Sequence, residues 1–446
     1  MKSPMNKTIR LSLTLILLIL FATATGCTLL QESPGIVVSP SPAATAPVAT
    51  PAAQATSDLS GLPAPAQSIA PLRLWLPPEI GARTEAGSAE LAEQLAAFRA
   101  ERGALEIAVE QKPVEGPGGI LAFLQAGRLV APSVMPDLVA VPTALLADPR
   151  ARDLFFPLDT RLAAESLGDI YPAPVSQIVR DDAFFGAPFA TAGLTHLLYD
   201  PAVITGTIPL NWSQFISVTN HTLVLPADSR EGALLGLQFY LAEGGNLSDD
   251  TGQPVLETEP LARALATIGM RKENLLQSHQ LKTLDEAWQY HQLGTSDFMW
   301  TRVEHLLGLQ AADPRLVGAQ AYSAVPGVSG ALLPLTTSWA WAITTSDPAR
   351  QALAGELIAF LTSAENMAAW TERSQMLPAR REAMALLSEL NPYYQFAGQE
   401  LERAQPMPVN EASRVMDALG DAVFQVLTTA TSPVLIAEQA ALSLRQ

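Results

Sequence analysis

Residues 332–384 read LLPLTTSWAWAITTSDPARQALAGELIAFLTSAENMAAWTERSQMLPARREAM, and their pattern predicts one strand followed by two helices. The first part, residues 332–343, is apolar and contains clustered threonines together with Trp339 and Trp341. β-Branched and aromatic side chains favour a pleated, half-buried strand. We therefore expect this stretch to form a strand inside a sheet.

A turn and two helices are expected after this strand. Ser346 or Asp347 suits a helix N-cap, and Pro348 suits the first helical position. Apolar residues then recur at helical spacing as far as Leu361. Ser363 is suited to cap a second helix, which is expected to end before the sequence Leu-Pro-Ala-Arg at residues 377–380.

The chain upstream predicts a parallel sheet. Strands are expected at residues 72–76, 105–109 and 136–141. Between them, one helix is expected from a cap at Ser88 to its end at Arg102-Gly103, and another at residues 120–126. Strands that alternate with helices are typical of a parallel sheet with right-handed crossovers. The sequence therefore predicts an α/β body that begins near residue 71.

The N-terminus has the features of a targeting segment. Basic residues precede an apolar run at residues 11–22, which is too short to span a bilayer but has the length of a signal-peptide core. The run leads to Ala-Thr-Gly-Cys at residues 24–27, which resembles a bacterial lipoprotein box, although Ala24 replaces the usual leucine. Cys27 is the only cysteine, so no internal disulfide can form. We expect a signal peptide at residues 1–26 and lipidation of Cys27; the alternative is an ordinary signal peptide with an incidental cysteine.

Residues 27–70 are rich in proline, alanine, serine and threonine. Such a composition buries too little apolar surface to fold by itself. The segment is expected to be a tether between a membrane anchor and a folded body at residues 71–446. A processing remnant is the alternative.

The pattern of residues 332–384 closely resembles the C-terminal signature of extracellular solute-binding protein family 1, the receptors of ABC importers. That family has a strand, a helix of A-x-x-F-I-x-F-L-T-S-x-E character and a closing L-P-A-R. Further resemblances occur in the family's order at residues 136–139 (PDLV), 156–159 (FPLD), 185–200, 209–215 (PLNWSQF), 295–300 and 324–327 (AVPG). Together they cover residues 72–384, and we interpret Trp212 within them as a packing residue.

The resemblance implies a two-lobed, periplasmic-binding-protein-like (Venus flytrap) α/β fold with hinge crossovers. The first lobe is expected at about residues 71–192 plus 324–362, and the second at about residues 193–323 plus 363–446. Two lobes joined by such crossovers can close on a ligand between them.

Composition and motifs argue against other classes of protein. A net charge of −17 disfavours nucleic acid as a partner, because phosphate binding needs clustered lysines and arginines. The glycine-rich residues 116–119 lack the Lys-Ser/Thr of a P-loop, and residues 327–330 lack the serine-hydrolase elbow. The histidines lack metalloprotease spacing. We therefore expect no catalysis, no cofactor and no metal.

The expected ligand contacts follow from the resemblance and from their residue types. Three tryptophans stand at positions that face the cleft in the family, and the apolar faces of sugar rings stack on such aromatics. Core packing is the alternative for each of them and is preferred for Trp75. Two further candidates lie at the crossovers, and two follow the first strand. The candidate ligand-binding residues are Trp300, Trp339, Trp341, Thr191, Tyr322, Glu79 and Arg83.

The resemblance implies the substrate-binding component of an ABC importer, anchored by lipid to the outer face of the cytoplasmic membrane. Its partners would be ABC permease subunits and a small solute, for which a carbohydrate is the expected class. Polyamines, iron and glycerol phosphate remain open, and the acidic composition favours a neutral or cationic ligand. The alternatives are a sensing module that presents its closed form to a membrane sensor kinase, and a secreted hydrolase.

Overall fold

The computed structural model describes residues 70–103, 105–130, 134–159, 168–276 and 278–445. The expected signal peptide, the lipidation of Cys27 and the tether up to residue 69 lie outside the described residues. Within the described ranges, no helix is both long enough and apolar enough to cross a membrane.

Strand β11 (Leu335–Ile343) lies in the middle of the first sheet, as the sequence predicts. It pairs antiparallel with β3 (Leu138–Pro142) on one side and with β6 (Ala187–Ala192) on the other. The seven-stranded sheet has the order β12-β6-β11-β3-β1-β2, and a further strand, β13, pairs with β11. The remaining strands are β1 (Leu72–Leu76), β2 (Ile107–Gln111), β12 (Leu377–Pro378) and β13 (Gln405–Pro406). The parallel pairing of β1 with β2 and with β3 confirms the expected parallel core of this sheet.

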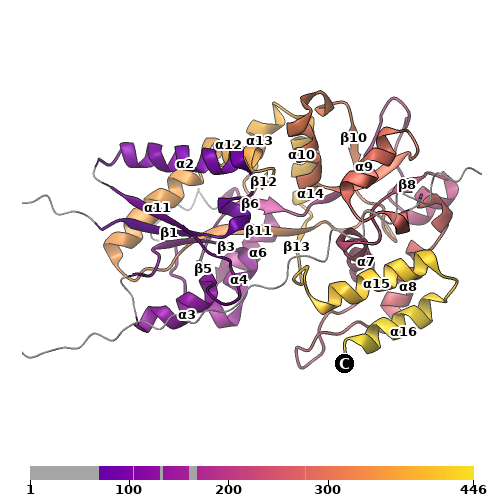
Figure 1. Ribbon diagram of the computed structural model, residues 1–446, viewed down its shortest axis with the longest axis horizontal. Coiled ribbons are helices and arrows are strands. Elements are labelled where there is room, and N and C mark those ends of the chain that lie inside the picture. The colour runs from indigo at the N-terminus through magenta and orange to yellow at the C-terminus, as the bar shows by residue number, and fades with distance from the viewer. Residues whose placement is uncertain (1–69, 104, 131–133, 160–167, 277, 446) are drawn as a thin grey trace, which may run out of the picture. The chain divides into compact units, whose positions relative to one another are not determined.

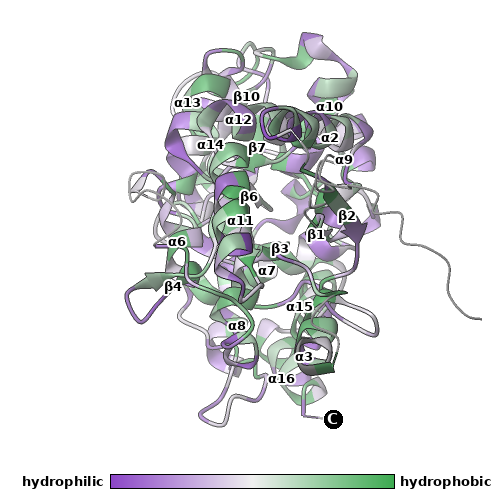
Figure 2. Ribbon diagram, turned by 90° about the vertical axis from the view of Figure 1, so that its left-hand side faces the viewer, coloured by the Kyte–Doolittle hydropathy of each residue, from purple (hydrophilic) through white to green (hydrophobic). Residues whose placement is uncertain are grey.

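Helices cover both faces of this sheet, as Figure 1 shows. Helices α2 (Glu85–Ala100), α11 (Pro348–Leu361) and α12 (Ala364–Arg373) supply the apolar side chains of one face. Helices α3 (Ile120–Val130) and α4 (Thr143–Ala147) supply those of the other face. Strands between two helical layers are buried on both sides, which is why β3 reads as the unbroken apolar run Leu-Val-Ala-Val. In Figure 2 much of the hydrophilic colour lies in the outer loops.

The helix caps follow the sequence in two helices and differ in a third. The carboxylate of Asp347 caps α11 by accepting hydrogen bonds from the amides of Ala349 and Arg350, and the side chain of Ser363 caps α12. The expected cap of α2 at Ser88 is wrong. The hydroxyl of Thr84 caps that helix by accepting a hydrogen bond from the amide of Gly87 at 2.9 Å. Thr84 is fixed there because its hydroxyl also donates to the Arg373 carbonyl at the end of α12, a contact that is remote in sequence.

The second sheet has four strands in the order β10-β7-β9-β8. Helices α7, α8, α15 and α16 pack on one face, and α9 and α10 pack on the other. Alternate residues of β9 serve the two faces: Phe298 and Trp300 join the first set of helices, and Met299 joins the second. The strands are β7 (Thr195–Tyr199), β8 (Leu223–Val224), β9 (Phe298–Arg302) and β10 (Ala321–Ser323). The helices are α7 (Arg230–Ala242), α8 (Thr258–Ile268), α9 (Leu284–Gln292), α10 (Val303–Ala312), α15 (Arg414–Thr428) and α16 (Pro433–Ser443).

Shorter elements complete the described chain. The helices among them are α1 (Pro78–Gly81), η2 (Pro149–Ala151), α6 (Pro172–Ile178), the π-helical turn η3 (Gln214–Val218), η4 (Lys272–Asn274), η5 (Ser278–Gln280), η6 (Pro314–Leu316), α13 (Arg381–Ser388) and α14 (Pro392–Leu401). A small hairpin consists of β4 (Val179–Arg180) and β5 (Ala183–Phe184).

In the part of the chain that the structure describes, the backbone passes between the two sheets at three crossovers. The first joins β6 to β7, the second joins β10 to β11, and the third joins β13 to α15. The expected boundary near residue 363 differs from the structure, because β12 pairs with β6 and α12 packs against α2 in the body of the first sheet. The last crossing therefore follows β13.

Candidate functional site

The carboxyl ends of the parallel strands define where a ligand site is expected. In open α/β sheets, ligands bind outside the carboxyl ends of the strands. In the first sheet, β1, β2 and β3 end at Leu76, Gln111 and Pro142. In the second sheet, the parallel strands β8 and β9 end at Val224 and Arg302.

A cavity of about 510 Å³ opens beyond the end of β8, between the start of α7 and the side of α15. We call it the acidic pocket. Its lining residues are Ala227, Asp228, Ser229, Arg230, Ala233, Glu411, Met416, Asp417, Gly420, Asp421 and Phe424. Carboxylates supply hydrogen-bond acceptors there, while Met416 and the half-buried Phe424 supply apolar surface. Its volume lies within the usual range of small-molecule sites, about 300–1,000 Å³.

The sequence after β8 builds one wall of this pocket. Ser229 caps α7: its hydroxyl accepts a hydrogen bond from the amide of Glu231 at 3.2 Å. Oδ2 of Asp228 lies 3.7 Å from the ammonium group of Lys282. A carboxylate has about four acceptor sites, so this one pair leaves Asp228 able to accept further hydrogen bonds in the pocket.

Behind the pocket, at the end of β9, several carboxylates lie around the guanidinium of Arg302. Its guanidinium donates two hydrogen bonds to Glu411, Nη2 to Oε1 at 2.8 Å and Nη1 to Oε2 at 3.2 Å. Oε2 of Glu304 lies 3.8 Å from Arg302 Nε, and Oε1 of Glu231 lies 4.0 Å from Arg302 Nη1. The Arg302 side chain is only 16% exposed, so these pairs lie in a poorly solvated environment.

The electrostatics of this cluster follow from burial and from mutual charge. Burial raises the pKa of Glu231, although the neighbouring Arg302 opposes the shift. Burial lowers the pKa of Arg302, but the carboxylates of Glu304, Glu411 and Glu231 outweigh it, so the net shift is upward. Arg302 therefore remains charged and compensates part of the surrounding negative charge.

An aromatic group with a lysine lies near the corresponding edge of the first sheet. The Lys112 ammonium lies 4.7 Å from the ring centroid of Trp75 and 4.8 Å from that of Phe123. Phe123 is 39% exposed, whereas Trp75 is 2% exposed, which confirms the expectation that Trp75 belongs to the core. Trp212 is completely buried against Phe239, so the packing role predicted for it is also confirmed.

The predicted tryptophans lie within packed layers. Trp300 is completely buried among the apolar side chains of the second sheet. Trp341 is 3% exposed and stacks on Phe189 at a centroid distance of 4.5 Å. Trp339 is 8% exposed. Because each stands inside a strand that has helices on both faces, its ring points into a core. Their role as ligand contacts stays a prediction.

Three of the other four predicted residues have hydrogen-bond partners of their own. The Thr191 hydroxyl lies 3.0 Å from that of Ser338, and the Tyr322 hydroxyl accepts a hydrogen bond from Gln310 at 3.2 Å. Arg83 donates to the Ser374 carbonyl at 2.8 Å, and Glu79 is exposed. None of the seven predicted contacts, all of which the structure describes, lines the acidic pocket.

Sequence reasoning missed the lining of the acidic pocket. The signal for Asp228 and Ser229 was present, because a helix-capping serine directly follows a short apolar strand in Leu-Val-Leu-Pro-Ala-Asp-Ser. Glu411 and Phe424 gave no comparable signal, since they reach the pocket through the third crossover and the packing of α15 on α7.

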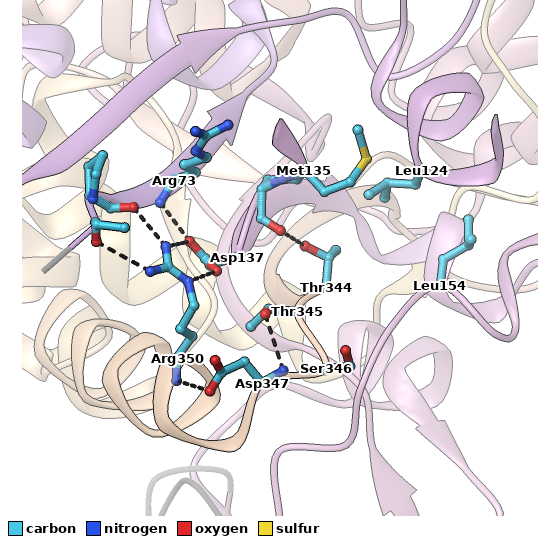
Figure 3. A pocket seen from close by; sticks show the side chains of 13 residues that line it. Arg73, Leu124, Met135, Asp137, Leu154, Thr344, Thr345, Ser346, Asp347 and Arg350 are labelled. Carbon is cyan, nitrogen blue, oxygen red and sulfur yellow. Dashed lines mark hydrogen bonds and ion pairs between the residues drawn. The ribbon is translucent and has the colours of Figure 1, made fainter. Parts of the chain in front are cut away.

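A cavity of about 570 Å³ lies at the amino ends of β1 and β3, the opposite edge of the first sheet (Figure 3). Its main charged groups are paired: Arg350 Nε donates to Asp137 Oδ1 at 2.6 Å, and Arg350 also bonds the carbonyls of Ala70 and Pro71. Figure 3 shows Leu124, Met135 and Leu154 on the far side of the cavity from this pair. We interpret the pair as the fastening of the first strand, not as a ligand site.

The comparisons with known proteins agree with this fold. A family model described as bacterial extracellular solute-binding protein matches residues 93–392, about two thirds of the chain. No curated protein matches the chain in sequence. The chain belongs to the bacterial extracellular solute-binding protein family.

Solved structures show the same architecture. The sugar-binding protein MalE from Xanthomonas citri has a TM-score of 0.66 at 17% identity, covering 84% of this chain and 96% of that one. An extracellular solute-binding protein family 1 member from Alicyclobacillus acidocaldarius has a TM-score of 0.64 at 18% identity, covering 85% and 98%. The maltose/maltodextrin-binding domain MalE from Bdellovibrio bacteriovorus, bound to maltotriose, has a TM-score of 0.56 at 20% identity, covering 84% and 99%. These similarities confirm the two-lobed α/β fold.

Proposed function

We propose that this protein is the substrate-binding component of an ABC importer and that it captures a carbohydrate in the acidic pocket. The observation that carries the proposal is the pocket itself: carboxylate acceptors line it together with the apolar side chains of Phe424 and Met416 at the carboxyl edge of the second sheet. Sugars present hydroxyl donors around apolar C–H faces, and this lining offers a partner to each. Among the similar structures, one is a sugar-binding protein and another is bound to maltotriose.

The proposal includes the remaining expectations from the sequence. Lipidated Cys27 anchors the body to the outer face of the cytoplasmic membrane, where permease subunits receive the ligand. Family membership supports only the coarser part of this proposal, an extracytoplasmic location. The two lobes close around the sugar. Tyr322, the least buried of the predicted aromatic contacts, is the one that meets the ligand in that closed form.

A thermal-unfolding screen tests the ligand class. The body from residue 70 onward is mixed with mono- and oligosaccharides, and with polyamines as the contrasting arm. A ligand that binds only the native state stabilises it by about 2.7 kcal/mol at a hundredfold excess over Kd. A raised midpoint with a sugar supports the proposal. A raised midpoint with a polyamine alone overturns the carbohydrate assignment.

Variants then locate the site. Asp417→Asn and Asp421→Asn remove exposed carboxylate charge without changing side-chain size. We expect Kd for the sugar to rise about tenfold in the double variant, because hydrogen bonds to charged groups contribute about 1.5–3 kcal/mol. Asp250→Asn, in an exposed turn outside the pocket, is the matched control. Equal affinities of all three proteins would place the ligand elsewhere.

The anchor has a separate test. Mass spectrometry of protein extracted from bacterial membranes is expected to find acyl chains on Cys27. Cys27→Ser is expected to release the protein from the membrane fraction. An unmodified cysteine in membrane-extracted protein would refute the anchor and leave the ligand proposal untouched.

A further inference from the structure

Arg302 occupies the meeting point of the first and third crossovers. It is the last residue of β9, and its two hydrogen bonds to Glu411 reach the segment that joins β13 to α15. Its neighbour Glu304 accepts a hydrogen bond from the amide of Gly193, which lies between β6 and β7, at 2.5 Å. One cluster of side chains therefore touches two of the three crossovers.

The guanidinium is held from several sides. Glu304 and Glu231 approach it at 3.8 and 4.0 Å, and a side-chain carbon added at Gly193 would lie 3.5 Å from Nη2. A planar guanidinium that pairs with a carboxylate through two parallel hydrogen bonds fixes the orientation of that carboxylate as well as its distance. Arg302 is therefore suited to orient Glu411.

Glu411 depends on such a contact because its own segment has no regular secondary structure. Residues 407–413 run from β13 to α15, and the amide of Met407 bonds the Thr336 carbonyl at the near end. Glu411 is 26% exposed and belongs to the lining of the acidic pocket, whereas Arg302 does not line it. Glu411 therefore reaches the pocket from a loop, and its side chain is held in place by the hydrogen bonds from Arg302.

We propose that Arg302 is a positioning residue for ligand binding. It holds Glu411 in the wall of the acidic pocket and ties the third crossover to the first, so that it sets ligand affinity without touching the ligand. The effect on affinity rests on the proposed function, while the fastening of residues 407–413 does not.

Two conservative variants of the full-length protein test the proposal. Arg302→Lys keeps the charge but cannot make the paired hydrogen bonds, and Glu411→Gln keeps the shape but loses the charge. With the sugar that stabilises the wild type, we expect each variant to raise Kd about tenfold in calorimetry at 25 °C. The double variant should bind no more weakly than the weaker single variant, because both changes break the same contact. Arg315→Lys, at the exposed pair with Asp313, is the matched control and should bind as the wild type does.

A merely structural arginine gives a different result. It would lower the unfolding midpoint of Arg302→Lys while leaving Kd unchanged at a temperature where the protein is folded, and its effect would add to that of Glu411→Gln. Either result would overturn the positioning role.

A second readout needs no ligand. Amide hydrogen exchange in residues 407–413 is expected to be faster in Arg302→Lys than in the wild type, while exchange in β1 and β3 stays the same. If the wild type binds no sugar, the proposed function fails, and this exchange measurement still decides whether Arg302 fastens the crossover. Unchanged exchange in residues 407–413 would overturn the inference.

Discussion

Single charged residues in this protein fasten segments that lie far apart in the sequence. Asp137, 3% exposed, accepts hydrogen bonds from the amide of Arg73 and from the side chain of Arg350. Arg350 in turn bonds the carbonyl of Pro71 at the start of the described chain. This one pair therefore joins β1, β3 and α11 at their shared edge.

We expect Asp137→Asn to destabilise the body strongly. The change leaves the half-buried Arg350 without its counter-charge, and breaking a buried pair from one side costs about 3–5 kcal/mol. Urea unfolding followed by tryptophan fluorescence measures the loss. Asp313→Asn, at the exposed pair with Arg315, is the control and should leave the midpoint unchanged, because exposed pairs contribute little. Similar midpoints for both variants would show that the Asp137–Arg350 pair contributes no more to the free energy of unfolding than the exposed pair does.

His196 predicts a dependence of stability on acid pH. It is completely buried beside Tyr393 and Tyr322, and burial lowers its pKa to about 3. The unfolded chain takes up this proton below its ordinary pKa of about 6.5, while the folded protein does not, so the free energy of unfolding falls as the pH falls from 6.5 towards 3. Between pH 7 and pH 5 this one group accounts for about 2 kcal/mol.

His196→Phe removes that titration and keeps an aromatic ring in the cluster. We expect the variant to lose about 2 kcal/mol less than the wild type between pH 7 and pH 5, measured by urea unfolding at both pH values. The other histidines are the same in both proteins, so their contributions cancel in the comparison. Parallel losses would mean that His196 is protonated in the folded protein.

At the scale of elements, helix starts show where local signals suffice. Asp347-Pro348 and Ser363 cap α11 and α12 as the sequence predicts, because each side chain bonds an amide two or three residues ahead. Thr84 caps α2 instead of Ser88, since its hydroxyl also reaches Arg373. A sequence pattern shows a cap that bonds an amide two or three residues ahead. It does not show a contact between residues that are remote in sequence, such as that of Thr84 with Arg373.

Thr84→Ala should destabilise the body by about 1 kcal/mol, the usual value for loss of an N-cap. Thr84→Ser keeps the hydroxyl and should stay close to the wild type in urea unfolding. If the alanine and serine variants unfold at the same concentration of urea, the cap at Thr84 contributes nothing.

Gly193 tests the backbone of the first crossover. Its φ is +85°, a region that L-residues avoid, while a side-chain carbon there would meet its neighbours only at 3.5 Å or more. We expect Gly193→Ala to lower stability by about 1–2 kcal/mol through backbone strain alone. Gly330→Ala, where an added carbon meets nothing within 4 Å, is the matched control in calorimetric unfolding. Equal melting temperatures would contradict a strained crossover.

At the scale of the whole molecule, two sheets joined by three crossovers make closure on a ligand the natural expectation. A ligand shifts such an equilibrium only if it binds the closed form better than the open one. We therefore expect a saturating sugar to reduce the radius of gyration measured by small-angle X-ray scattering. A sugar that binds tightly and leaves the scattering curve unchanged would argue against hinge closure.

The sequence by itself determined the fold class, the parallel β1-β2-β3 core, the central strand β11 and the family. Each of these is written in local periodicity, in caps and in the order of short motifs, which are properties of neighbouring residues. Trp75 and Trp212 were also predicted to be packing residues. An aromatic side chain inside an apolar strand or at the start of a helix is expected to pack against the apolar core next to it.

Only the tertiary structure decided the composition of the candidate site. The acidic pocket combines Asp228, which follows β8, with Glu411 and Phe424, which arrive through the third crossover and α15. Whether a tryptophan lies in a core or at a ligand depends on which helices cover its strand, and the structure buries Trp300 and Trp341. Such proximities arise from the packing of remote segments, which no spacing along the chain encodes.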